Sequence, residues 1–279
     1  MKAIRTFEEL RQQVEACHKH PRVVAVRPID AASQETLRQV QESHLAEVIA
    51  VDAPTPEEAA SQAVSIVRNG EADILVKGLI GTDQLLRAVL NKETGLLPPG
   101  RILTHLAAAE IPGYHKLLYF TDAAVIPYPT HEQRIEQVRY ATAICQKLGI
   151  SEPKIALIHC AEHGGKQFPF VDGYADIKQQ AEKGAFGPCL VDGPMDIKAA
   201  CSLDGLKTKG LSSPLMGEAD VLVMPDIEAG NALYKSMSLF AHAKTAGILC
   251  GTICPVVVPS RGDSADAKFN SILFAIASL

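Results

Sequence analysis

Short apolar runs alternate with helical patterns along almost the whole chain. Runs rich in Val, Ile and Leu predict buried strands, and apolar residues that recur every three or four positions predict amphipathic helices. Strands are expected at residues 23–26, 48–51, 74–76, 102–109, 116–120, 155–158, 189–191, 221–224, 248–250 and 256–258. This alternation is typical of a mainly parallel sheet that helices cover on both faces, so we expect the α/β class.

Capping residues predict where the helices begin. Thr6, Thr55 and Thr130 are each followed three residues later by Glu or Gln, which is the pattern of a capping box. Ser33 is expected to open another helix, and the remaining helices are expected near residues 82–90, 174–183, 197, 231–243 and 269–276. The strands at 102–109 and 116–120 flank a Pro-Gly turn at 112–113, which predicts an antiparallel pair.

The stretch 255–268 predicts a strand, a turn and a helix in succession. Three consecutive valines precede Ser-Arg-Gly-Asp-Ser at 260–264, and the last helical pattern follows. A helix start carries unpaired N–H groups and a partial positive charge, so with the Ser260 hydroxyl and the Arg261 guanidinium it would bind a phosphate. The alternative is a capped loop in which Ser260 and Asp263 satisfy backbone groups and Arg261 is solvated. The stretch by itself favours neither interpretation.

A second predicted strand is also followed directly by a turn and a helix. Lys77 ends a predicted strand, and residues 78–83 lead into the next helix. In parallel sheets, ligands bind outside the carboxyl ends of the strands, and Lys77, Asp226 and Ser260 all fall at such ends. We therefore expect the functional site at this edge.

Composition and charge narrow the class of protein. A chain of 279 residues fits one large or two medium domains, and 47% hydrophobic residues with 21% charged residues is ordinary for a globular protein. The net charge of -5 argues against a nucleic-acid partner. The first residues have no signal-peptide pattern and no run is apolar enough to span a bilayer, so we expect a cytoplasmic protein without a membrane partner.

The cysteines do not suggest disulfides or a metal centre. The chain has 7 cysteines, which are scattered and mostly lie inside apolar runs, and no C-x-x-C pair is present. We expect small buried hydrophobic residues in a reducing compartment.

Several short blocks follow one another in order from residue 76 to the last helix. They are Val-Lys-Gly-Leu-Ile at 76–80, Leu-Arg-Ala-Val-Leu-Asn-Lys-Glu-Thr-Gly-Leu at 86–96, Thr-Asp-Ala-Ala at 121–124, Val-Asp-Gly-Pro at 191–194, Ser-Pro at 213–214, Gly-Glu-Ala-Asp at 217–220, Pro-Asp-Ile-Glu-Ala-Gly-Asn at 225–231 and Pro-Ser-Arg-Gly-Asp-Ser at 259–264. Taken together, these blocks resemble the phosphate acetyltransferase and phosphate butyryltransferase family. The first two blocks look more like the butyryl side of the family.

The resemblance implies a fold and an assembly. The fold is similar to that of the isocitrate and isopropylmalate dehydrogenases, with two α/β/α domains and a cleft between them. The implied first domain comprises residues 1–99 with 248–279, and the second comprises residues 100–247. The crossings would lie at Gly95 to Gly100 and near Gly247, and a homodimer or higher homo-oligomer is expected.

The chemistry implied by the resemblance is reversible acyl transfer between coenzyme A and phosphate. Coenzyme A or acyl-CoA and phosphate or acyl phosphate would be substrates, with no metal and no further cofactor. Such a reaction needs a cationic phosphate clamp, donors for the developing oxyanion and a base for the thiol. The resemblance assigns these roles and the substrate contacts to a small set of residues. The clamp is Arg87 and Arg261, Ser260 binds phosphate or the oxyanion, and Lys77, Thr82, Asp226, Asn231 and Ser264 contact substrate.

The identity of the base is open. Acetyl-type relatives have an aspartate seven residues past the serine, whereas this chain has Ala267 there. Asp263 and Asp266 are the candidate bases, and the alternative role for each is to cap the final helix.

Three other interpretations follow from particular residues. His159 and His163 match the H-x-x-E-H pattern of zinc peptidases, but a predicted strand precedes them and two glycines follow, so we expect a polar loop that could contact coenzyme A. A decarboxylating dehydrogenase would use Asp226, Asp263 and Asp266 as metal ligands, yet no dinucleotide motif is present. The replacement at Ala267 leaves open a catalytically silent acyl-CoA-binding protein.

Overall fold

The computed structural model describes residues 3–17, 20–260 and 262–279, which form two compact α/β units. We name the first the terminal unit, because it combines Thr6–Leu103 with Lys244–Leu279. The second, the central unit, comprises Thr104–Ala243 and the N-terminal residues through Arg5. Ile4 is held in the central unit, where its N–H donates to the Leu148 carbonyl at 3.2 Å. The predicted α/β class is confirmed.

The terminal unit is built on a mainly parallel sheet. Its strands lie in the order β2 (Glu47–Val51), β1 (Arg22–Val26), β3 (Ile74–Lys77), β10 (Val256–Val257) and β9 (Lys244–Cys250). The first four run parallel, and β9 runs antiparallel to β10. The C-terminal strand β10 pairs directly with β3, where Val257 lies opposite Val76. The sheet of this unit therefore needs strands from both ends of the sequence.

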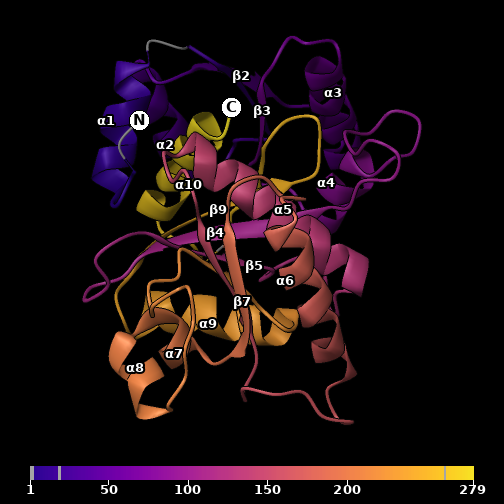
Figure 1. Ribbon diagram of the computed structural model, residues 1–279. Coiled ribbons are helices and arrows are strands. Elements are labelled where there is room, and N and C mark those ends of the chain that lie inside the picture. Colours follow the sequence, from indigo (N-terminus) through magenta and orange to yellow (C-terminus); the bar gives the residue numbers. More distant parts are fainter. Residues whose placement is uncertain (1–2, 18–19, 261) are drawn as a thin grey trace. The chain divides into compact units, whose positions relative to one another are not determined.

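Helices cover both faces of the terminal sheet. Figure 1 shows α1 (Phe7–Ala16), α2 (Ala31–Glu42) and α10 (Ala265–Ala277) on one face, and α3 (Pro56–Arg68) with α4 (Thr82–Val89) on the other. α10 packs against α1, α2 and β9, and Asn270 through Ile276 are all buried, as expected for a helix enclosed on every side. Within the described part of the chain, no helix combines the length and apolar character needed to cross a membrane.

The central unit has its own five-stranded order. It comprises β4 (Thr104–Glu110), β5 (Leu118–Thr121), β8 (Val221–Val223), β6 (Lys154–Ile158) and β7 (Leu190–Met195). β4 and β5 are antiparallel with Ala108 opposite Tyr119, which confirms the predicted pair. β5, β8, β6 and β7 run parallel, so their carboxyl ends share one edge.

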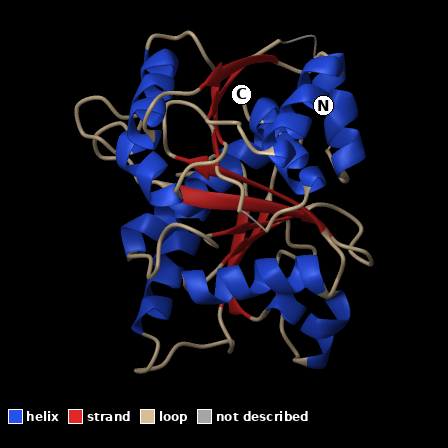
Figure 2. Ribbon diagram, turned by 180° about the vertical axis from the view of Figure 1, so that it is seen from behind, coloured by secondary structure: helices blue, strands red, loops and turns tan. Residues whose placement is uncertain are grey.

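Alternate strand residues of the central unit fill two apolar layers. Phe120, Ala156 and Leu222 face one layer, because successive side chains of a strand point to opposite faces. That layer packs against α7 (Ile197–Cys201), α8 (Leu203–Thr208) and α9 (Ile227–Leu239). The other face is covered by α5 (His131–Lys147), with α6 (Tyr174–Glu182) and a short 3-10 turn (Pro169–Gly173) beside it. Figure 2 shows helices on both sides of these strands.

Three helix starts confirm the capping prediction. The hydroxyls of Thr6, Thr55 and Thr130 accept hydrogen bonds from the N–H groups of the residues three positions later, at 3.1, 3.2 and 3.2 Å. At Thr130 the box is complete, because its own N–H donates to Gln133 Oε1 at 2.8 Å.

Two helix starts were placed too late by the sequence pattern, and α8 was not predicted. α2 is capped by Asp30, whose carboxylate accepts from the Ser33 N–H at 2.9 Å, so Ser33 lies inside the helix. α9 begins at Ile227 and not at Asn231, because Asp226 caps it and accepts from the Ala229 N–H at 2.8 Å. In both cases an aspartate upstream of the predicted start supplies the cap.

The cap of α2 can be tested by truncation. We expect Asp30→Ala to lower the free energy of unfolding by about 1 kcal/mol, because the Ser33 N–H loses its acceptor. The measurement is urea unfolding followed by circular dichroism. Ser33→Ala is the matched variant and should cost less, and an equal loss in the two variants would contradict the assignment of Asp30 as the cap.

All 7 cysteines are free. Cys145, Cys250 and Cys254 are buried as predicted, whereas Cys17 and Cys160 are exposed. Burial raises the pKa of the Cys254 thiol to about 12, so this cysteine remains a neutral apolar residue at physiological pH.

Candidate active site

Two strand-to-helix junctions of the terminal unit leave the sheet at the same edge. β3 and β10 are parallel neighbours, with Val76 opposite Val257. Residues 78–81 lead from β3 to α4, and residues 258–264 lead from β10 to α10. Both helices therefore begin at the carboxyl edge of the sheet, where their N-terminal N–H groups favour an anion. The sequence prediction that Lys77 and Ser260 fall at such an edge agrees with these strand ends.

Ser260 opens a closed turn with an exposed hydroxyl. The Ser260 N–H donates to Asp263 Oδ2 at 2.7 Å, and the Asp263 N–H donates back to the Ser260 carbonyl at 3.1 Å. The Ser260 hydroxyl accepts from the Gly262 N–H at 3.4 Å, and the residue is exposed. Arg261, the predicted phosphate clamp, lies outside the described residues. These bonds join Ser260 to Asp263, and Ser260 remains exposed.

The cap of α10 is Ser264. Its hydroxyl accepts from the Ala267 N–H at 3.1 Å, which gives Ser264 the capping role that the sequence left open for Asp263 or Asp266. Asp263 instead holds the Ser260 N–H, and Asp266 is exposed in the first turn of the helix. Ala267, at the position of the expected aspartate, is buried. The Asp266 carboxylate is therefore the more accessible of the two candidate bases.

α4 presents Thr82 and Arg87 to solvent. Thr82 is the first residue of the helix and is exposed. The Arg87 side chain is 79% exposed, and its Nη2 lies 3.8 Å from Asp83 Oδ2, one turn earlier in the helix. Helical side chains lean toward the N-terminus, so the guanidinium lies back along the helix toward its start. The Arg87 side chain therefore contributes little to stability, and its guanidinium is accessible to a phosphate.

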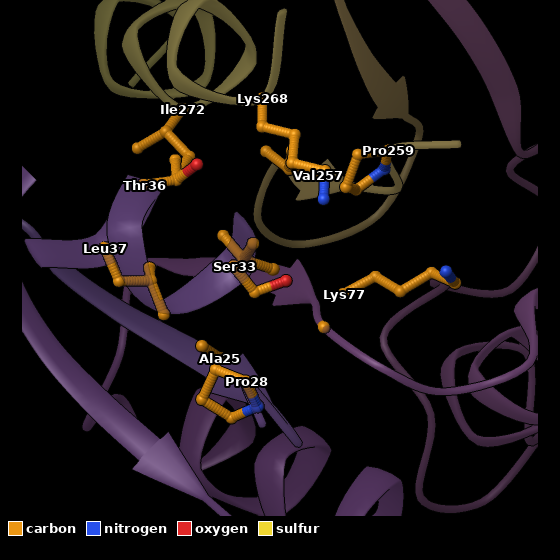
Figure 3. A pocket seen from close by; sticks show the side chains of 12 residues that line it. Ala25, Pro28, Ser33, Thr36, Leu37, Lys77, Val257, Pro259, Lys268 and Ile272 are labelled. Atoms are coloured by element: carbon orange, nitrogen blue, oxygen red, sulfur yellow. The ribbon is translucent and has the colours of Figure 1, made fainter. Parts of the chain in front are cut away.

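Lys77 is buried at the end of β3, beside a small cavity. Figure 3 shows the cavity between Ser33, Lys268 and Val257, with the side chain of Lys77 directed away from them. Its volume of about 10 Å³ is roughly that of one water molecule. Lys268 lies there 3.8 Å from the Asp30 carboxylate. A space of this size cannot hold a phosphate, so the cavity is not the anion site.

Asp226 and Asn231 belong to the central unit, where both have structural partners. Asp226 caps α9, and Asn231 Nδ2 donates to the Ala123 carbonyl at 3.1 Å. A Cβ at Gly230 would collide with the Asp122 carbonyl oxygen, so only glycine allows the two backbones to approach so closely. The block at 225–231 therefore joins α9 to the loop after β5.

That loop is organised by the buried carboxylate of Asp122, which is 1% exposed. Its Oδ2 accepts from the Thr104 hydroxyl at 2.8 Å and from the His105 N–H at 3.0 Å. The N–H groups of residues 124, 125 and 126 donate to the same carboxylate at 2.7, 2.8 and 3.2 Å. The Thr-Asp-Ala-Ala block at 121–124 is thus a structural hub of the central unit.

The H-x-x-E-H residues do not form a helix. Residues 159–163, all of them described, follow β6 as a bend, which is the polar loop predicted for them. His159 is 4% exposed, and burial holds its pKa below the usual value, so its imidazole stays neutral. Glu162 forms an ion pair with Lys209, and His163 is exposed. Among the described residues, no three His, Cys, Asp or Glu side chains gather to hold a metal ion.

The central unit contains a much larger pocket at the carboxyl ends of β6, β7 and β8. Its volume is about 570 Å³, within the range of small-molecule sites. It is lined by Ile158, His159, Cys160, Asp196, Ile197, Lys198, Met224, Pro225, Ala229, Ala232, Leu233 and Ser236. The four α9 residues are spaced i, i+3, i+4, i+7 on one helix face. The sequence pattern did not predict this pocket, because its lining residues come from separate segments of the chain.

Comparisons with known proteins agree with the blocks quoted above. The family model described as "Phosphate acetyl/butaryl transferase" matches residues 8–276. Phosphate butyryltransferase of Clostridium acetobutylicum is 37% identical over 225 residues, which cover 81% of this chain and 74% of that protein. Phosphate acetyltransferase of Thermotoga maritima is 36% identical over 222 residues, which cover 80% of this chain and 75% of that protein.

A solved structure supports the same assignment. A branched-chain phosphotransacylase from Enterococcus faecalis superposes with a TM-score of 0.82 at 33% sequence identity, covering 92% of this chain and 98% of that chain. The blocks, the two junctions and these matches lead to one conclusion. The chain belongs to the phosphate acetyl/butyryl transferase family.

Proposed function

We propose that this protein transfers a short acyl group between coenzyme A and inorganic phosphate, interconverting acyl-CoA and acyl phosphate. The observation that carries the proposal is the pair of junctions in the terminal unit. The family blocks at 76–80 and 259–264 leave adjacent parallel strands at one edge, and two helix N-termini begin there. This arrangement suits the phosphate that both directions of the reaction require.

The phosphate group would be held by charge and by hydrogen bonds. Arg87 and Arg261 form the cationic clamp, since guanidinium forks match phosphate oxygens and stay charged. The Ser260 hydroxyl, exposed in its closed turn, donates to phosphate or to the oxyanion. Thr82 and Ser264 supply helix-start N–H groups at the same edge, and Lys77 meets phosphate or the diphosphate of coenzyme A.

We propose that the acyl transfer uses side chains of this protein and no metal or further cofactor. The thiolate sulfur of coenzyme A attacks the carbonyl carbon of the acyl phosphate, a carbon–sulfur bond forms, and phosphate leaves as the carbon–oxygen bond breaks. Asp266 or Asp263 accepts the thiol proton. We prefer Asp266, because the Asp263 carboxylate already accepts from the Ser260 N–H and so fixes the turn. In the reverse direction, a phosphate oxygen attacks the thioester carbonyl, the carbon–sulfur bond breaks, and the coenzyme A thiolate leaves and takes the proton back from the aspartate.

Asp226 and Asn231 would act indirectly. Asp226 holds the start of α9 and Asn231 holds the loop after β5, so we propose that they shape a substrate surface in the central unit. The butyryl-type wording at 86–96 favours a butyryltransferase, and an acetyltransferase is the alternative.

Assembly and compartment are further parts of the proposal. Leu239 and Phe240, at the end of α9, are 66% and 76% exposed, and a second subunit would cover these adjacent apolar side chains in the homodimer or larger homo-oligomer that we propose. The free cysteines support a reducing, cytoplasmic compartment.

Thiol release tests the reaction. Purified protein is incubated with butyryl-CoA or acetyl-CoA, with and without phosphate, in the presence of a chelator, and free coenzyme A is measured with a thiol reagent. We expect phosphate-dependent release that Arg261→Ala abolishes. A protein that binds coenzyme A but releases none with either substrate would be a silent binder, and the proposal would fail. NAD reduction that depends on added metal would favour a dehydrogenase instead.

A further inference from the structure

Lys268 is a largely buried cation in the first turn of α10. It is the fourth residue of the helix, and its side chain is 12% exposed. Its N–H donates to the carbonyl of the capping residue Ser264 at 3.1 Å. A lysine is seldom buried without a close partner, because its ammonium loses its hydration. The burial of this charge therefore needs a compensating interaction.

The ion pair of Lys268 supplies little of that compensation. Among the residues that the structure describes, its one ion-pair partner is Asp30, whose Oδ1 lies 3.8 Å from the ammonium nitrogen, beyond hydrogen-bond distance. The same oxygen accepts from the Ser33 N–H at 2.9 Å and so already serves the cap of α2. A pair at this separation, without a hydrogen bond, recovers only part of the cost of desolvation. The positive charge of Lys268 is thus only partly balanced within the terminal unit.

The side chain of Lys268 reaches both strand-to-helix junctions of the terminal unit. It lines the small cavity of Figure 3 together with Gly78, from the junction after β3, and Pro259, from the junction after β10. The buried residue Lys77 lines the same cavity from the end of β3. Lys268 therefore lies at the carboxyl edge of the sheet, beside the two segments that carry the proposed phosphate site.

The charge of Lys268 also has the same sign as the start of its own helix. A helix N-terminus carries a partial positive charge, so a carboxylate is favourable in the first turn and a cation there is unfavourable. Helical side chains lean toward the N-terminus, which brings the ammonium of Lys268 toward the helix start and the segment 260–264. The helix dipole and the ammonium repel each other in the free protein, and both attract a phosphate at this edge.

We infer that Lys268 strengthens phosphate binding through its charge, an inference that rests on the proposed function. The cavity beside Lys268 is too small for a phosphate, so the anion lies outside it, at the helix start, and the ammonium acts across the intervening distance. At an effective dielectric constant of about 20, two unit charges about 10 Å apart attract each other enough to change an affinity roughly tenfold.

Two substitutions distinguish this role from that of a structural ion pair. Lys268→Met removes the charge and keeps a long apolar side chain. Asp30→Asn removes the charge of the partner and keeps the cap of α2, since Asn and Asp cap helices equally well. If the charge of Lys268 attracts phosphate, the two variants have opposite effects, because the first loses the attraction and the second removes a competing anion. If the pair only joins α2 to α10, the two variants have the same effect.

The experiment measures Kd for inorganic phosphate by calorimetry at constant ionic strength, and KM for phosphate and for butyryl-CoA. We expect Lys268→Met to raise Kd and KM for phosphate roughly tenfold and to change KM for butyryl-CoA by less than about twofold. Asp30→Asn should lower Kd for phosphate by about two- to threefold, and Lys268→Arg, which keeps the charge, should stay within about threefold of the unmodified protein. Thermal unfolding in phosphate-free buffer checks that each variant is folded.

Three results would overturn the inference. One is a Kd for phosphate that Lys268→Met leaves unchanged. Another is a Kd for phosphate that Asp30→Asn raises, because the ion pair and not the charge of Lys268 would then support the site, and this result decides even if Lys268→Met does not fold. The third is an equal rise of KM for phosphate and for butyryl-CoA in Lys268→Met, because the charge would then serve coenzyme A as well. If the unmodified protein binds phosphate but releases no coenzyme A from either ester, the proposed function fails, and the Kd values still decide whether Lys268 strengthens phosphate binding.

Discussion

Replacing Arg87 with glutamine is expected to reduce kcat/KM for the phosphate-dependent reaction by roughly a hundredfold or more. The substitution removes a cationic fork from the proposed phosphate clamp. It should leave the melting temperature nearly unchanged, because the side chain is 79% exposed and its contact with Asp83 is 3.8 Å long. Steady-state kinetics at varied phosphate concentration, with differential scanning fluorimetry, measures both effects.

Arg38→Gln is the matched control for this prediction. Arg38 lies on α2, is 55% exposed and pairs with Glu35 and Glu42, so it is an exposed helical arginine with no proposed part in the reaction. Its replacement should change kcat/KM by less than about twofold. If the two variants retained the same activity, Arg87 would have no role in phosphate binding.

Replacing Asp122 with alanine is expected to lower the free energy of unfolding by about 3 to 5 kcal/mol. The carboxylate is buried and accepts from the Thr104 hydroxyl and from four backbone N–H groups, at His105 and at residues 124–126. Alanine would leave all these donors without their acceptor in the protein interior. Guanidinium unfolding, monitored by circular dichroism, gives the free energy.

Asp204→Ala provides the control for Asp122→Ala. Asp204 is exposed in the first turn of α8, so its replacement should cost no more than about 0.5 kcal/mol. A loss of less than about 1 kcal/mol in Asp122→Ala would show that water replaces the carboxylate and that this loop is not an organising hub.

Much of the fold follows from local patterns in the sequence. The valine-rich runs at 23–26 and 256–257 form strands because they can be buried on both faces. Threonine caps place the starts of α1, α3 and α5. The starts of α2 and α9 were harder to predict because more than one polar residue could cap each helix. The residue that caps a helix depends on where the preceding strand ends. The end of that strand depends in turn on its pairing with distant strands.

The strand pattern predicted the edge of the sheet at which the candidate site residues lie, but not the hydrogen bonds between them. The parallel pairing of β3 with β10 brings the segments after Lys77 and before Ser264 to one edge, as the strand pattern indicated. Periodicity does not reveal that Asp263 binds the Ser260 N–H or that Ser264 caps α10, because neighbouring Ser and Asp residues can exchange these roles. The sequence pattern did not predict the pocket of the central unit, because its lining residues come from separate segments of the chain.

The position of β10 beside β3 bears on how the chain matures on the ribosome. Residues 6–103 precede residues 256–257 in synthesis, so β3 pairs with β1 first and receives its second neighbour only when residues 256–257 have emerged. Until then β3 presents an unpaired strand edge, and the face that α10 covers is open to solvent. The central unit, whose strands all lie within Thr104–Ala243, can be completed earlier. We therefore expect the terminal unit, which carries the proposed phosphate site, to complete its fold after the central unit, once α10 has emerged from the exit tunnel.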